Sequence, residues 1–303
     1  MRTWTMAFSF RPGEESAEDG LKRIGRSQIE SGLDELRDEE LVQAEKVHQV
    51  RKRCKKMRGL LRLVRPAFGA YKAENTCFRD AARTLSGVRD RTAVLETLDE
   101  LEAHFDAELK KAALRPLRTR LEAAHARLDE TEVEEKLADM RLVFREALDR
   151  VESWTLDGNG AEAISKGAAK TYKRAVKTME AAAGSGEADA FHDWRKRTKY
   201  HWYHLRLMRK AWPDVLGAYA DQAHALSSLL GDHHDMAVLT ETARDHLGEE
   251  DETYELLAGL CHTRMTIIAD EALSLGERLF CEDKGAFRQR TGAIWAAAVS
   301  DAA

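Results

Sequence analysis

A basic segment with the same spacing of charged residues occurs twice in the chain, 144 positions apart. The first copy, HQVRKRCKKMRGLLRLVR, covers residues 48–65, and the second, HDWRKRTKYHWYHLRLMR, covers residues 192–209. On an α-helix, which turns about 100° per residue, each copy gathers its cations on one stripe and its apolar residues on the opposite face. The stripes comprise His48, Arg51, Lys52, Lys55 and Arg62 in the first copy, and His192, Arg195, Lys196, Lys199, Arg206 and the following Lys210 in the second. We therefore expect two helices that each bury one side and present a column of cations from the other.

Acidic residues are missing from both columns. Residues 46–65 contain nine Lys or Arg and no acid, and residues 195–210 contain seven and none. Like charges one helical turn apart repel, so a helix that faced only solvent would gain from interspersed acids. The formal net charge of the chain is −5, but a local concentration of cations attracts anions whatever the total. The columns therefore predict an anionic ligand.

The repeat extends beyond the basic segments. Leu-Ser-Gly-Val-Arg-Asp at 85–90 pairs with Leu-Leu-Gly-Asp-His-His-Asp at 229–235, and Lys22 and Arg26 lie opposite Lys166 and Lys170 at the same offset. Helical periodicity dominates elsewhere. An internal duplication predicts an all-α fold of two similar antiparallel four-helix bundles, with pseudo-two-fold symmetry around a basic central groove. Residues 6–10 alternate and suggest a short N-terminal strand.

Breaks in the helical pattern divide the chain. The Leu-Asp-Gly-Asn-Gly linker at 156–160 predicts a first half at 1–155 and a second at 161–283, followed by a C-terminal tail at 284–303. Residues 229–235 predict a turn between two helices. Asp189 is expected to cap the second basic helix, with His192 in its first turn. No apolar run is long enough to span a membrane, the N-terminus lacks a signal peptide, and the cysteines form no CxxC pair, so a cytoplasmic protein with reduced thiols is expected.

A third basic stripe precedes the second basic helix. Lys166, Lys170, Lys173 and Lys177 lie within about 60° of one another on a helical wheel. Such a run taken alone is typical of a solvated surface. Because it comes directly before a second basic helix in a predicted hairpin, we expect it to form the other wall of the groove.

These motifs, in this order, resemble the CHAD domain, the conserved histidine α-helical domain. The likeness runs from about residue 8 to residue 280 and rests on His-x-x-Arg-Lys-x-x-Lys at 192–199 and approximately at 48–55, on the runs at 78–90 and 229–235, and on Ile-Ser-Lys-Gly at 164–167. The resemblance implies two four-helix bundles around a basic cavity, inorganic polyphosphate as the ligand, and a place on polyphosphate granules. The CYTH-type hydrolase domain that accompanies many members is not evident, so no hydrolytic activity is expected.

The cationic columns agree with that ligand, because Arg offers forked donors to phosphate oxygens and Lys acts as a mobile point charge. We predict a non-catalytic polyphosphate-binding module that needs no metal or cofactor. The predicted binding residues are Lys22, Arg26, His48, Arg51, Lys52, Lys55, Arg62, Arg79, Arg83, Arg89, Lys166, Lys170, Lys173, Lys177, His192, Arg195, Lys196, Lys199, Tyr203, Arg206 and Lys210.

Two other functions are compatible with the sequence. Asp232-His-His-Asp235 together with His192 is similar to the ligand set of HD-type metal-dependent phosphohydrolases, since His and carboxylate suit Zn, Mn or Fe; the matching turn at 88–90 has no His. A scaffold for nucleic acid or an acidic protein is the other alternative. Proteins that bind single strands interleave several aromatics with cations, whereas only Tyr203 falls inside a stripe, so weak, salt-sensitive nucleic-acid binding is expected.

Overall fold

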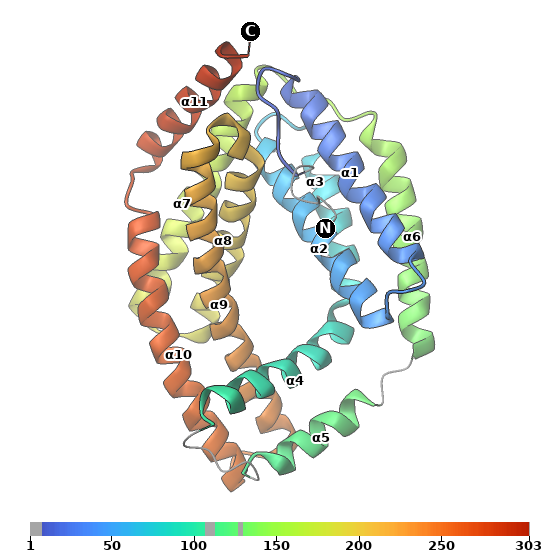
Figure 1. Cartoon of the computed structure of the whole chain (residues 1–303), viewed down its shortest axis with the longest axis vertical. Coiled ribbons are helices and arrows are strands. Elements are labelled where there is room, and N and C mark those ends of the chain that lie inside the picture. Colours follow the sequence, from blue (N-terminus) through green and yellow to red (C-terminus); the bar gives the residue numbers. More distant parts are fainter. Residues whose placement is uncertain (1–7, 107–112, 127–129, 303) are drawn as a thin grey trace.

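The chain is built from helices, as the computed structural model shows for residues 8–106, 113–126 and 130–302 (Figure 1). Within these ranges there is no strand, and the all-α prediction is confirmed. The helices are α1 (Ala17–Arg37), α2 (Gln43–Val64), α3 (Tyr71–Thr84), α4 (Ser86–His104), α5 (Arg115–His125), α6 (Glu130–Val151), α7 (Gly160–Ser185), α8 (Ala188–Met208), the 3-10 helix η1 (Arg209–Ala211), α9 (Pro213–Leu247), α10 (Glu252–Leu279) and α11 (Lys284–Ser300).

The helices fall into two groups that meet at the basic helices. Figure 1 shows α1, α2, α3 and α6 on one side and α7 to α11 on the other. Helix α2 packs against α1 and α3 in its own group and against α7 and α8 in the other. The two segments of the sequence duplication, α2 and α8, are therefore in direct contact near the middle of the fold.

Among the described residues, apolar side chains form two separate cores. The larger one joins the helices on both sides of the α2–α8 contact and contains Trp154, Tyr172 and Trp194. The smaller one is shared by α4, α5, α9 and α10, and is made of Val94, Leu98, Leu101, Leu114, Leu117, Leu121, Met236, Leu239, Ala243, Leu257 and Cys261. Helices from before and after the 156–160 linker thus pack into one core. The division of the chain into two halves at that linker follows the sequence repeat and stays a prediction.

The predicted N-terminal strand is absent from the described residues. Met6 and Ala7 lie outside them, and Phe8–Phe10 form a loop whose two aromatic side chains are buried. The Phe10 N–H donates to the carbonyl of Leu207 in α8, at 2.9 Å. Alternation of apolar residues here reflects a loop packed on helices, which offer no strand to pair with.

The second half differs from prediction in three places. Helix α9 runs without interruption through 229–235, and Gly231 lies beside the Arg195 guanidinium, 3.5 Å from the position that a Cβ would take. A Cβ at that distance would be in ordinary van der Waals contact, so Gly231 neither forms a turn nor is required by the approach of Arg195. Helix α8 begins at Ala188, so Asp189 lies inside its first turn and His192 comes after that turn. Residues 284–300 form α11, which packs on α7 with Phe287 buried.

Helices α2 and α7 approach each other closely at Gly167. A Cβ there would lie 1.7 Å from the carbonyl oxygen of Leu63, a backbone atom that cannot move without its helix. We expect Gly167→Ala to lower the free energy of unfolding by about 1–3 kcal/mol or more, measured by denaturant titration. Gly184→Ala, in the same helix with no atom within 4 Å, should raise it by up to about 1 kcal/mol. Equal effects of the two substitutions would contradict the close approach.

Candidate anion-binding site

The two basic helices cross at equivalent positions of the repeat. A Cβ at Gly59 of α2 would lie 3.0 Å from the Cβ of Tyr203 in α8, and these residues are separated by the 144-residue offset of the duplication. His204 is buried in the same contact, with Nε2 3.1 Å from the Gly59 carbonyl oxygen. Burial lowers the pKa of His204 well below its usual range, so its ring is neutral. Because Gly59 allows close approach, the cations that flank each helix are brought next to those of the other.

Six cations gather on the side of this crossing that Tyr203 faces. We call them the lysine cluster: Lys52, Lys55 and Lys56 of α2, and Arg195, Lys199 and Arg206 of α8. Burial, with Arg195 and Lys55 nearby, lowers the pKa of Lys199 to about 8. Burial, followed by the charges of Arg53 and Arg206, lowers the pKa of Lys56 to about 7. Both lysines therefore lie where protonation is already costly in the free protein.

Several cations of the lysine cluster lie over aromatic rings. The Lys199 Nζ lies 4.3 Å from the centre of the Trp202 ring, and the Arg206 guanidinium lies 5.1 Å from the same ring. The Lys56 Nζ lies 5.4 Å from the centre of the Phe8 ring, and the Arg206 guanidinium lies 5.6 Å from the same ring. Cation–π contacts of this kind contribute about 0.5–2 kcal/mol. They hold the cations in place without neutralising them, which leaves their charge available to a ligand.

A second group of cations lies on the side that His204 faces. We call it the arginine cluster: Arg58, Arg62 and Arg65 of α2, Lys170 and Arg174 of α7, and Arg197 of α8. The Arg62 guanidinium lies 4.3 Å from the centre of the Tyr200 ring. Burial lowers the pKa of Arg197, and the charges of Arg174 and Arg62 lower it further. Three helices thus bring their cations together here.

The two histidines that begin the stripes are placed differently. His48 is exposed on α2, whereas the ring of His192 is half-buried and stacks on His234 of α9, with centroids 3.8 Å apart. Burial is the main reason why the pKa of His192 is lowered, and Lys196 and Arg195 add to the effect. Burial and the neighbouring His192 lower the pKa of His234 to about 3. Both stacked rings are therefore neutral near neutral pH.

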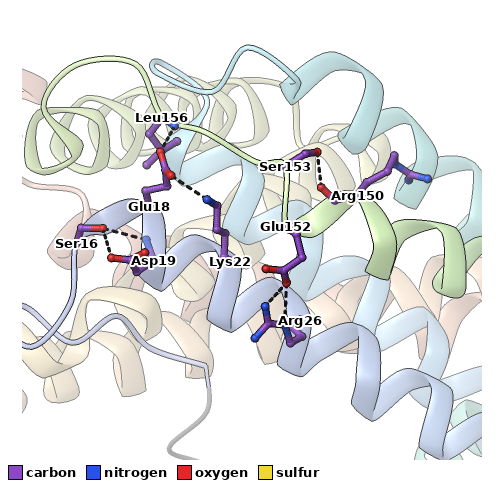
Figure 2. Close-up of polar contacts among 9 residues, drawn as sticks. All are labelled: Ser16, Glu18, Asp19, Lys22, Arg26, Arg150, Glu152, Ser153 and Leu156. Carbon is purple, nitrogen blue, oxygen red and sulfur yellow. Dashed lines mark hydrogen bonds and ion pairs between the residues drawn. The ribbon is translucent and has the colours of Figure 1, made fainter.

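Several cations of the predicted set are paired with acids instead. Figure 2 shows Lys22 bound to Glu18, at 2.9 Å, and Arg26 bound to Glu152. The other pairs are Lys166 with Glu162, Lys196 with Asp193, and Arg79 with Asp80. Exposed ion pairs of this kind are weak, but each acid reduces the local positive charge. These five cations contribute less to an anion site than those of the two clusters.

The remaining predicted residues belong to neither cluster. Arg51 is half-buried and donates to the Ala82 carbonyl at 3.1 Å. Lys173 and Lys177 are exposed on α7, Arg83 is exposed on α3, and Lys210 lies in η1. Arg89 lies outside the residues whose side chains the structure describes. Conversely, the sequence interpretation missed Lys56, Arg58, Arg65, Arg174 and Arg197.

The histidines of 232–235 do not converge with acids. His233 is buried and stacks on Phe191, with centroids 4.4 Å apart, while His234 turns to His192. Across the described part of the chain, no three His, Cys, Asp or Glu side chains are grouped as a metal ion would require. In the same ranges, no helix is both long and apolar enough to cross a membrane.

A helical protein whose cations gather where two duplicated helices cross belongs to a narrow class of proteins, and comparison with known families identifies it. Residues 27–244 match the model of the CHAD domain family, and the chain belongs to that family. Its fold is similar to the crystal structure of the CHAD domain from the plant Ricinus communis, with a TM-score of 0.65 and 16% sequence identity over 92% of this chain and 96% of that one. A search of curated proteins gave no match.

Proposed function

We propose that this protein binds inorganic polyphosphate through the lysine cluster. The observation that carries the proposal is the convergence of Lys52 and Lys55 of α2 with Lys199 of α8, close enough for their charges to lower the pKa of Lys199. Polyphosphate binding is a property of the CHAD family at large, which supports the same ligand here. CHAD domains are generally non-catalytic binding modules, so we propose binding without turnover.

A repeating polyanion suits this arrangement better than a compact anion does. The cations come from two helices that cross, so they are spread along a path and do not focus on one point. Each phosphate of a chain can neutralise one or two of them, and the lysine side chains can adjust to its position. Because the cluster is partly dehydrated, each charge pair is stronger than it would be in bulk water.

We also propose that the duplicated halves form two related bundles with a pseudo-two-fold axis near the crossing. The crossing at residues 59 and 203 supports this relation, as an axis there would require equivalent positions to meet. The ion pairs Lys22–Glu18 and Lys166–Glu162 occur at the same offset. The axis would place the basic groove between the halves. We also propose that the protein is cytoplasmic and lies on polyphosphate granules.

Nucleic acid is a weaker candidate for the lysine cluster. Trp202 is half-buried and is covered by Lys199 and Arg206. Tyr200 is similarly covered by Arg62. Bases need exposed ring faces on which to stack, so these rings favour a ligand that has phosphates and no bases. RNA should compete for the site only at low salt.

Chain length gives a direct test of this function. We expect affinity per chain to rise at least tenfold from triphosphate to long-chain polyphosphate, because a chain that contacts both helices makes its second contact intramolecularly. Isothermal titration at several salt concentrations should also show affinity falling steeply with salt, since bound cations displace condensed counterions. Equal affinity for triphosphate and the long chain, or a flat salt response, would contradict the proposal. RNA of the same charge serves as the control ligand.

A further inference from the structure

We propose that the arginine cluster is a second anion-binding site, and that its ligand is a compact phosphate group with free terminal oxygens. The proposed function does not require this site, because polyphosphate binding was assigned to the lysine cluster. Of the six residues, the predicted set contained only Arg62 and Lys170. The chemistry fits either a free phosphate or pyrophosphate, or the terminal phosphate of a polyphosphate chain.

The cluster is both partly dehydrated and open to solvent. Arg58, Arg62, Arg65 and Arg197 are half-buried, whereas Lys170 and Arg174 at its edge are exposed. Burial is the largest reason why the pKa of Arg58, Arg65 and Arg197 is lowered. A ligand can therefore reach guanidinium groups that have already lost much of their water, at a small further cost of desolvation.

Several guanidinium donors in this cluster are buried without a partner in the described structure. They are the Nε of Arg62 and the Nε and Nη2 of Arg65. A buried donor without an acceptor costs about 1–3 kcal/mol, and more when it is charged. Tyr71 is a hydrogen-bond partner of the Arg65 side chain. The two guanidinium groups are therefore incompletely satisfied from within the chain, while both residues are only half-buried and still expose part of their side chains.

The acids around the cluster are already engaged. Asp193, which faces Arg197, is bound to Lys196 at 2.9 Å. Asp80 is bound to Arg79 at 2.8 Å. Arg58 contacts only a neutral amide oxygen among its hydrogen-bonded partners in the described residues, that of Asn75, at 3.4 Å. The positive charge of the cluster is therefore poorly balanced from within.

Arginine makes this imbalance permanent. A crowded lysine can lose its proton, as the lowered pKa values of Lys56 and Lys199 indicate. A guanidinium does not deprotonate in proteins, so repulsion among the arginines persists at every physiological pH and is relieved only by an anion. The planar guanidinium fork matches two oxygens of one phosphate. A terminal phosphate, with three free oxygens, can bridge several such forks.

The two clusters are separated by the packed contact between α2 and α8. Tyr203 lies beside Lys199, with its ring centre 6.0 Å from the lysine Nζ. His204 lies within the influence of Arg62 and Arg65, whose charges help to lower its pKa. Since both residues are buried at Gly59, the helix contact itself lies between the two groups of cations. The sites should therefore be separable by substitution.

Titration with pyrophosphate tests the proposal. Arg62→Gln with Arg65→Gln should weaken pyrophosphate binding at least tenfold, while Lys52→Gln with Lys55→Gln should leave it within about threefold of the wild type. A double variant at the exposed residues, Lys170→Gln with Arg174→Gln, should weaken it too, and gives a readout if the first variant fails to fold. Arg145→Gln with Lys284→Gln, both exposed on other helices, is the matched control for lost charge. If both arginine-cluster variants bound pyrophosphate as tightly as the wild type does, the proposal would be overturned.

Polyphosphate with esterified ends separates the two sources of the ligand. If the site takes chain ends, blocking them should reduce wild-type affinity to that of the Arg62 and Arg65 variant. If it takes free phosphate, blocked and unblocked chains should bind alike while pyrophosphate binding still depends on the arginines. The lysine-cluster variants report on the proposed polyphosphate function independently, because they should lose long-chain binding and keep pyrophosphate.

Discussion

Raising the pH from about 6.5 to about 9 should weaken the binding of long-chain polyphosphate by at least tenfold. The lowered pKa values of Lys56, about 7, and Lys199, about 8, mean that both amines lose protons across this range in the free protein. A bound polyanion restores their pKa values towards normal, so binding takes up protons above the free pKa. Affinity is therefore highest below about pH 7 and falls as the pH rises. Phosphates inside the chain stay ionised throughout.

Lysine-to-arginine substitution isolates this effect. Lys56→Arg with Lys199→Arg keeps both charges at every pH, so its affinity should stay nearly constant from about pH 6.5 to about pH 9. The groups that face Lys56 are Arg53, Arg206, Lys52 and Glu35; those that face Lys199 are Arg195, Lys55, Arg206 and Lys52. A guanidinium group does not deprotonate in proteins. The same pH dependence in the variant and the wild type would contradict the assignment of this effect to the two lysines.

Charge reversal in either helix should weaken polyphosphate binding on the order of a hundredfold. The two variants are Lys52→Glu with Lys55→Glu in α2, and Arg195→Glu with Lys199→Glu in α8. Each places two acids among the remaining cations, where they repel the ligand and bind those cations instead. Titration against long-chain polyphosphate measures the effect, and circular dichroism checks the helices. Arg145→Glu with Lys284→Glu changes the net charge equally and should cost less than about threefold. If only one helix mattered, the site would not span the crossing.

The helical fold and the basic helices could be predicted because they depend on local periodicity. The cation stripes, the apolar faces and the 144-residue offset are all visible in the sequence. The turn predicted at 229–235 was wrong because a single glycine in a helical pattern costs only about 1 kcal/mol relative to alanine, which packing can offset. Leu230 and His233, close to Gly231 in α9, are both buried. Such packing between helices leaves no local pattern in the sequence.

The division into two cation clusters could not be predicted for a related reason. A helical wheel places Lys55 and Arg62 on one stripe, but the crossing at Gly59 lies between them along α2. Lys55 therefore joins the lysine cluster and Arg62 joins Arg197. Lys56 and Arg58 are not in the predicted stripe, and the sequence does not show where a second helix crosses, so their place in the clusters could not be predicted. The available signal for the crossing was that the repeat has a glycine, Gly59, where its second copy has an aromatic residue, Tyr203.

A crystal structure of the protein with long-chain polyphosphate tests the central claim most directly. We predict phosphate oxygens within hydrogen-bonding distance of the Nζ atoms of both Lys55 and Lys199, so that one chain joins the two helices. A chain that followed the exposed lysines of α7, or that contacted α2 or α8 alone, would contradict it.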